Sequence, residues 1–288
     1  MHLRPIGRVA RTSILALLTL ICLVSPALSK SSHDMLPDAI KAKGKIIVGI
    51  NGIFPPMEYK EPGHEELIGF DVDLTKAIGE KLEITIAFDD QKFDQLINSV
   101  NTKRVDMVIS GLSDTDARRK SLDFIDYFNS GTQCFTTKEH AETITDLYSL
   151  SGKTFAVSAA TDYLTTMQKW SADNLESQGK PGITILAVDS EATARLQMIQ
   201  GRAQSSAVSP EVLGWLAKKN PGQFIPVGPV LNPDPYGICF SKDNTVLRDA
   251  VFAALEELFS DGSYQAILAK WEISSGALSA PLINGEKR

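Results

Sequence analysis

An alternation of β-rich runs with helical periodicity is the feature that most constrains the fold of this chain. Residues Lys45 to Ile50 are β-rich, apolar residues then recur at helical spacing from Phe70 to Leu82, and a second β-rich run covers Ile84 to Phe88. This order predicts a βαβ unit whose two strands lie parallel in one sheet. A helix from Phe93 to Val100 and a strand from Val105 to Ile109 repeat the pattern.

A second cycle of the same pattern begins in the middle of the chain. A strand is predicted from Thr154 to Ser158 and a helix from Tyr163 to Trp170. A strand from Ile183 to Val188 and a helix from Ala192 to Ile199 follow. Two such cycles predict an α/β protein with two lobes, each built on a parallel sheet with crossover helices.

Two segments rich in turn-forming residues are expected to carry the chain between the lobes. They are Asp126 to Thr132, and Pro229 to Pro235. The helical pattern from Asn244 to Trp271 is expected to return to the first lobe and complete it. The predicted division is lobe 1 at residues 30–131 plus 236–288, and lobe 2 at residues 132–235.

The N-terminus has the organisation of a secretory signal peptide. Residues Met1 to Thr12 carry three arginines and no acidic residue, and a short apolar run from Ser13 to Val24 follows. Small residues precede a predicted cleavage after Ser29, so residues 1–29 are expected to be removed. An uncleaved anchor is disfavoured by the break at Pro26, and a lipid on Cys22 by the large residue before it. The mature protein is expected in the periplasm.

Charge and residue type exclude several other functions. The formal net charge is −6 and no basic cluster is visible, so a nucleic-acid partner is not expected. The histidines stand at no metal-ligand spacing, and no phosphate-binding glycine loop or esterase serine motif is present, so no metal or cofactor is expected. Cys134 and Cys239 either form one disulfide or lie buried as free thiols; the sequence leaves both open.

Four short motifs in one order give the chain a family resemblance. They are Phe54 to Glu58, Gly69 to Leu74, Ser110 to Arg118, and Pro235 to Ile238. From about Pro37 to Trp271 the chain resembles the periplasmic amino-acid-binding proteins of ATP-driven (ABC) importers, solute-binding protein family 3. The resemblance implies the two-lobed periplasmic-binding-protein fold, with two doubly wound sheets joined by a two-crossing hinge. It implies no catalysis, a small ligand carrying a carboxylate, and docking of a monomer on a membrane permease.

In this family the segment from Ser110 to Arg118 holds the ligand's polar end. The resemblance implies that Arg118 grips a carboxylate with its planar guanidinium, which offers two parallel donors where a lysine would offer a point charge. Ser110, Gly111, Leu112 and Ser113 would surround the same group with backbone groups and hydroxyls. The alternative is that Arg118 and its two basic neighbours form a solvated run.

The resemblance also implies ligand contacts on both lobes. Phe54 and Phe93 match positions where a ring lines the ligand's flank, although each is also a reasonable core residue. On the second lobe, Ala160, Thr161 and Asp162 follow a strand and open a helix, where backbone N–H groups would meet a carboxylate. Asp162 is expected either to cap that helix or to face the ligand.

Two departures from the family pattern concern the ligand's ammonium group. Asn51 and Ser209 stand where family members carry aspartates that pair with it. A buried ammonium without a carboxylate partner is costly. Either Asp162 supplies the charge from a shifted position, or the ligand is a modified amino acid or a carboxylate without a free amine. Cationic amino acids are the least expected ligands.

The predicted mechanism is capture by hinge closure, in which lobe 1 meets the ligand first and lobe 2 then closes over it. Two alternatives remain open. One is a periplasmic dehydratase of cyclic carboxylic acids on the same fold, with Asp162 or Glu58 as its acid. The other is a sensor subunit that presents its ligand-bound form to a membrane receptor.

Overall fold

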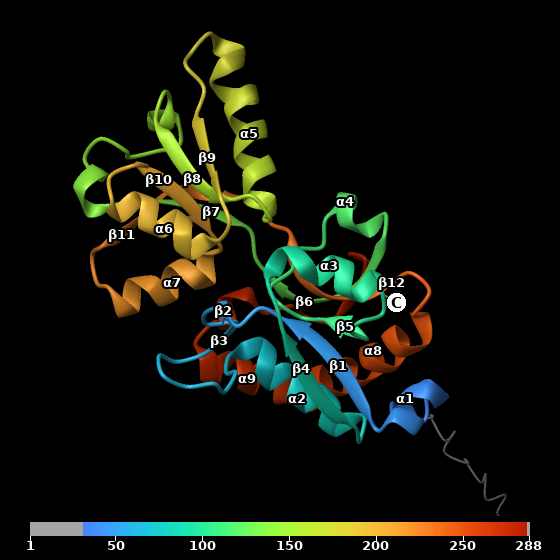
Figure 1. The fold of residues 1–288 in the computed structure, drawn as a ribbon. Helices are drawn as coiled ribbons and strands as arrows, with labels where there is room; N and C mark the ends of the chain where they lie inside the picture. Colours follow the sequence, from blue (N-terminus) through green and yellow to red (C-terminus); the bar gives the residue numbers. More distant parts are fainter. Residues whose placement is uncertain (1–30, 287–288) are drawn as a thin grey trace, which may run out of the picture. The chain divides into compact units, whose positions relative to one another are not determined.

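The computed structural model describes residues 31–286 (Figure 1). The predicted signal peptide and its cleavage site lie outside these residues. Within residues 31–286 no helix is both long enough and apolar enough to cross a membrane.

The first sheet has six strands in the order β13-β6-β12-β5-β1-β4. Its parallel part consists of β4, β1 and β5. Strand β12 pairs antiparallel with β5, β6 antiparallel with β12, and β13 antiparallel with β6. The strands are β1 (Lys45–Ile50), β4 (Thr85–Asp90), β5 (Met107–Val108), β6 (Leu122–Asn129), β12 (Pro235–Ser241) and β13 (Leu282–Ile283). The expected parallel sheet is therefore mixed.

Helices cover both faces of this sheet because alternate strand residues are apolar on each side. Val48 joins a core that includes α2, α8 and α9, while Val108 joins a second core with α3. The helices of this lobe are α1 (Asp38–Lys43), α2 (Phe70–Lys81), α3 (Phe93–Asn101), α4 (Asp116–Arg119), α8 (Thr245–Ser260) and α9 (Ser263–Trp271). The single helix expected from Asn244 to Trp271 is interrupted at Gly262, whose φ of 84° is left-handed.

The second sheet has five strands in the order β11-β7-β10-β8-β9. Strands β10, β8 and β9 are parallel, and β7 is antiparallel to both of its neighbours. The strands are β7 (Thr132–Thr137), β8 (Thr154–Ser158), β9 (Thr184–Val188), β10 (Ser205–Val208) and β11 (Phe224–Leu231). One face packs on α5 (Asp162–Asn174), and the other on α6 (Glu191–Ile199) and α7 (Pro210–Lys219). Figure 1 shows these three helices around the sheet.

The chain passes between the sheets twice, at residues 130–131 and 232–234. Both passages fall inside the segments expected to be crossings, but they are shorter than expected. The turn predicted from Asp126 to Thr132 is wrong for its first half, because β6 continues to Asn129. Tyr127 and Phe128 are fully buried there, and their packing outweighs the turn propensity of the residues around them.

Cys134 and Cys239 are free and buried in different sheets. Cys134 lies in β7 and Cys239 in β12, each within an apolar cluster. Burial raises the pKa of both thiols to about 12, so neither is a reactive thiolate at neutral pH. Of the two alternatives, the structure has the buried free thiols.

The two sheets each carry helices on both faces, and the chain crosses between them twice. This confirms the expected two-lobed fold. A short hairpin, β2 (Ile53–Phe54) and β3 (Glu58–Tyr59), follows β1 and brings Phe54 beside Gly111.

Candidate functional site

A cavity of about 240 Å³ lies where the loops of the two lobes meet. It is bounded by residues that follow β1, β5, β8 and β9 and by the first residues of α3, α5 and α6. Ligands of open α/β sheets bind beyond the carboxyl ends of the strands in this way. The volume suits one small organic molecule. The lining residues are Asn51, Ile53, Phe54, Lys92, Phe93, Asp94, Gly111, Ser158, Thr161, Asp162, Tyr163, Asp189, Ser190, Glu191 and Ala192.

Half of the residues predicted for the site line this cavity. They are Asn51, Phe54, Phe93, Gly111, Thr161 and Asp162. The other six do not line it: Ser110, Leu112, Ser113, Arg118, Ala160 and Ser209. Leu112 and Ser209 are fully buried, Leu112 within the core packed on α3.

Ser110 and Gly111 are fixed from below by two buried acids. Ser110 Oγ accepts from the Asn51 N–H at 3.0 Å and donates to Glu58 Oε1 at 2.7 Å. The Gly111 N–H donates to Asp71 Oδ2 at 2.9 Å, so it is directed into the protein. The resemblance had implied that this N–H faces the ligand. Gly111 has a φ of 52°, and a Cβ there would lie 2.8 Å from the Phe54 ring. A glycine is therefore required at this wall of the cavity.

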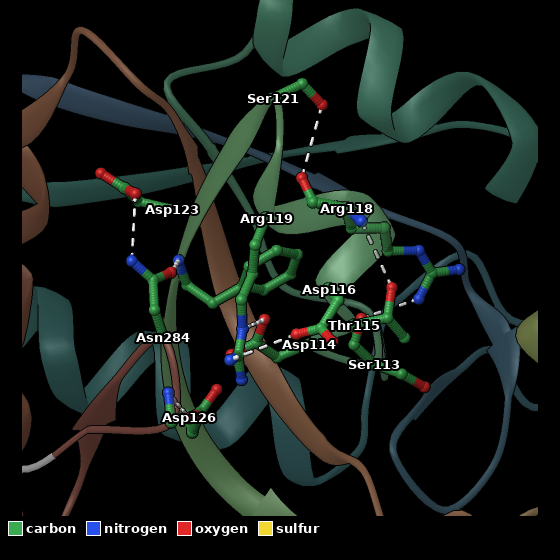
Figure 2. A network of polar contacts seen from close by, with 12 residues as sticks. Ser113, Asp114, Thr115, Asp116, Arg118, Arg119, Ser121, Asp123, Asp126 and Asn284 are labelled. Carbon is green, nitrogen blue, oxygen red and sulfur yellow. Dashed lines mark hydrogen bonds and ion pairs between the residues drawn. The ribbon is translucent and has the colours of Figure 1, made fainter.

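The three consecutive basic residues at the end of α4 have three different environments. Arg118 is half-buried and donates from Nη1 to the Ser113 carbonyl at 2.8 Å (Figure 2). Arg119 forms a bidentate pair with Asp114, with Nε–Oδ1 at 2.6 Å and Nη2–Oδ2 at 2.9 Å. Only Lys120 is exposed. Among the described residues Arg118 makes no ion pair, which leaves its guanidinium available to a carboxylate.

The Arg119–Asp114 pair belongs to a network that also holds Asn284 and Gly285 against β6 (Figure 2). Asp126 on β6 accepts from the Gly285 N–H at 2.9 Å, and Asn284 bonds β6 through both its amide atoms. Burial, together with the neighbouring Asp114 carboxylate, raises the pKa of Asp126 from 3.8 to about 8.

Stability is expected to depend on pH through Asp126. The folded state keeps this carboxyl protonated between pH 3.8 and about 8, whereas the unfolded chain has released the proton. The stabilisation is full below that range and is lost as pH rises toward about 8. Urea unfolding from pH 5 to 9 should therefore show a flatter pH dependence for Asp126→Asn than for the natural chain. Parallel curves would contradict a buried, protonated Asp126.

The second lobe presents a helix N-terminus to the cavity. Thr161 is the N-cap residue of α5, and Asp162 is its first helical residue, so of the two roles left open for Asp162 the structure does not have the N-cap. Thr161 Oγ1 donates to the Ser158 carbonyl at 2.9 Å and fixes the turn that leads out of β8. Asp162 and Tyr163 then border the cavity from the start of the helix.

Sequence reasoning missed the acidic residues of the lining, Asp94, Asp189 and Glu191. Asp189 and Glu191 directly follow β9, as Thr161 and Asp162 follow β8, and this parallel was the available signal. Glu191 Oε2 is buried without a hydrogen-bond partner. Burial raises the pKa of Glu191 to about 8, although the nearby Arg195 opposes the shift.

Comparisons with known proteins agree with this architecture. The family model of bacterial extracellular solute-binding proteins, family 3, matches residues 46–274. The arginine-binding protein ArgT of Corynebacterium glutamicum is 32% identical over 87% of this chain and 81% of that protein. The L-cystine-binding protein TcyJ of Escherichia coli is 28% identical over 94% of this chain and 97% of that protein. An ancestral arginine-binding protein bound to arginine superposes with a TM-score of 0.72 at 31% identity, covering 79% of this chain and 98% of that one.

Proposed function

Because this chain belongs to the bacterial extracellular solute-binding proteins of family 3, we propose that it captures a cationic amino acid for an ATP-driven importer. Its role is to bind a solute outside the cytoplasm, as members of the family do. The cationic class of the ligand rests on one feature of the site, the excess of carboxylates around the cavity.

Four carboxylates and a single ammonium line the cavity: Asp94, Asp162, Asp189 and Glu191 against Lys92. Glu191 matters most, because its Oε2 is buried and has no partner among the described residues. An unpaired buried carboxylate is costly, and a ligand cation would supply the missing partner. The arginine-binding relatives are consistent with such a ligand.

This proposal departs from the sequence argument, which found no acid at Asn51 and Ser209, named only Asp162 as a replacement and expected cationic amino acids least. The cavity instead offers acids from the starts of α5 and α6, namely Asp162 and Glu191. A ligand with a carboxylate and one or two cationic groups could therefore meet Arg118 at one end and these acids at the other.

Hinge closure would complete the site. Arg118 lies outside the cavity lining, while Thr161 and Asp162 border the cavity from the other lobe. Rotation about the crossings at residues 130–131 and 232–234 would bring the two sets together around a ligand. The closed form would then dock on the permease, with the protein acting as a periplasmic monomer released from its signal peptide.

An enzymatic role receives less support from the site. Glu58, one of the two candidate acids, is buried beneath Ser110 and does not line the cavity. Asp162 alone would remain, and the named relatives are binding proteins.

Isothermal titration calorimetry with arginine and its neutral analogue citrulline tests the proposed ligand class. The mature protein is expected to bind arginine at least roughly tenfold more tightly, because citrulline lacks the charge that the acids would neutralise. Glu191→Gln should weaken arginine binding by roughly 10- to 100-fold. The exposed Glu139→Gln on the same lobe is the control and should leave it unchanged. Equal affinities for arginine and citrulline, or full affinity in Glu191→Gln, would contradict the proposal.

A further inference from the structure

Two carboxyl groups are packed together directly beneath the cavity wall. Glu58 lies on β3 and Asp71 in the first turn of α2, and both side chains have no solvent exposure. Neither residue lines the cavity. Buried acids this close to a binding site need a reason, because ionised carboxylates are strongly disfavoured away from water.

Each acid holds one end of the segment from Ser110 to Gly111. Glu58 Oε1 accepts from Ser110 Oγ at 2.7 Å, and Asp71 Oδ2 accepts from the Gly111 N–H at 2.9 Å. The Tyr127 hydroxyl donates to the same Asp71 oxygen at 2.9 Å. Ser110 Oγ in turn accepts from the backbone of Asn51, so the hydrogen bonds lead from the acids to two residues of the cavity lining.

The remaining oxygen of each carboxyl group, Glu58 Oε2 and Asp71 Oδ1, is buried without a donor. Asp71 Oδ2 already accepts two hydrogen bonds, as an ionised carboxylate does, whereas Glu58 accepts one. The two side chains lie within hydrogen-bonding reach of each other, so a proton held between Glu58 and Asp71 would give these free oxygens a partner.

Within residues 31–286 neither Glu58 nor Asp71 forms an ion pair with a lysine or arginine that would replace that proton. The groups that act on Glu58 are Asp71 and, from α6, Glu191; those that act on Asp71 are Glu58 and, from α7, Glu211. From β6 the phenol of Tyr127 donates to Asp71. The charged neighbours named here are all acids, which favours retention of one proton.

We propose that Glu58 and Asp71 share one proton and act as positioning residues that hold Ser110, Gly111 and Asn51 in the geometry that binds the ligand. This inference rests on the proposed binding function of the cavity. Loss of the proton would leave two negative charges in contact and push the segment out of place.

The titration of the pair agrees in direction with this arrangement. Burial, followed by the charge of Asp71, raises the pKa of Glu58 well above its ordinary value. Burial also raises the pKa of Asp71 to about 7, although donation from Gly111 and Tyr127 opposes the shift. The pair is therefore expected to keep a proton at neutral pH and to lose it in the alkaline range, where affinity should fall.

The variant Glu58→Gln distinguishes the titration of the acid pair from the titration of the ligand. Glutamine keeps an oxygen for Ser110 and donates a permanent N–H to Asp71, so affinity at pH 7 should stay within about threefold of the natural protein. Between pH 7 and 9.5 the natural protein should lose roughly tenfold more affinity for arginine than the variant does. Titration of the ligand is the same for both proteins and cancels in this comparison. Glu58→Ala, which lacks both contacts, should bind arginine roughly tenfold more weakly than Glu58→Gln at every pH.

Asp126→Asn is the matched control, because Asp126 is a buried acid of the same lobe without a contact to the cavity lining. Its variant should keep the natural pH profile of affinity.

An infrared difference spectrum of ligand-free natural protein minus Glu58→Gln should show one protonated carboxyl lost. If no amino acid binds the natural protein, the proposed function fails, while this spectrum still decides the shared proton. Identical pH profiles, or no lost carboxyl band, would overturn the inference.

Discussion

Replacing Arg118 by alanine is expected to weaken the binding of an amino acid by roughly 100-fold or more, about 3 kcal/mol. The half-buried guanidinium is held by the Ser113 carbonyl and makes no ion pair among residues 31–286, so its remaining donors are free for a ligand carboxylate. Binding of arginine measured by calorimetry provides the test. Stability should change little, because the side chain makes only that one hydrogen bond within the described chain.

Two further variants serve as comparison and control for Arg118→Ala. Arg118→Lys keeps the charge but loses the planar fork, so a partial loss of affinity is expected. Lys120→Ala removes an exposed charge on the same short segment and should leave affinity unchanged. Arg119 is unsuitable as a control because its pair with the buried Asp114 is structural. Unchanged affinity in Arg118→Ala would show that the ligand carboxylate is held elsewhere.

The periodicity of the sequence was sufficient to predict much of the fold. The strand Thr154–Ser158 was placed correctly because buried parallel strands give short apolar runs that helices bracket. The segment from Asp126 to Thr132 was misread because local turn propensity carries no information about Tyr127 and Phe128, whose burial depends on distant elements. Strand β13 was not predicted for the same reason, because its pairing with β6 joins residues more than 150 positions apart in the chain.

The site was predicted only in part, for a related reason. Motifs located Asn51, Phe54 and Gly111 at the cavity, but a motif does not show which way a backbone group points. The Gly111 N–H donates to Asp71, and that fact depends on how β3 and α2 pack beneath it. Glu191 was missed because its importance comes from burial without a partner, which only the assembled structure reveals.

Gly69→Ala is expected to be among the most damaging single substitutions outside the cavity. Gly69 precedes α2 with a φ of 135°, a conformation that an L-residue rarely adopts. A Cβ there would lie 2.1 Å from the Met57 carbonyl oxygen, which accepts the Asp71 N–H at 2.8 Å. Backbone cannot yield as a flexible side chain does, so we expect a loss of ~3 kcal/mol or more in the free energy of unfolding, measured with urea.

The position of Gly69 links this loss of stability to binding. The hydrogen bond from the Asp71 N–H to the Met57 carbonyl joins the hairpin that carries Glu58 to the helix that carries Asp71. Separating these two elements would therefore also separate the two acids. Gly214→Ala is the control, since Gly214 lies inside α7 with no atom near a new Cβ and should gain about 0.5–1 kcal/mol. Folded Gly69→Ala protein should bind arginine more weakly than Gly214→Ala protein at the same pH. Equal affinity in the two would mean that the hairpin and helix contribute to stability alone.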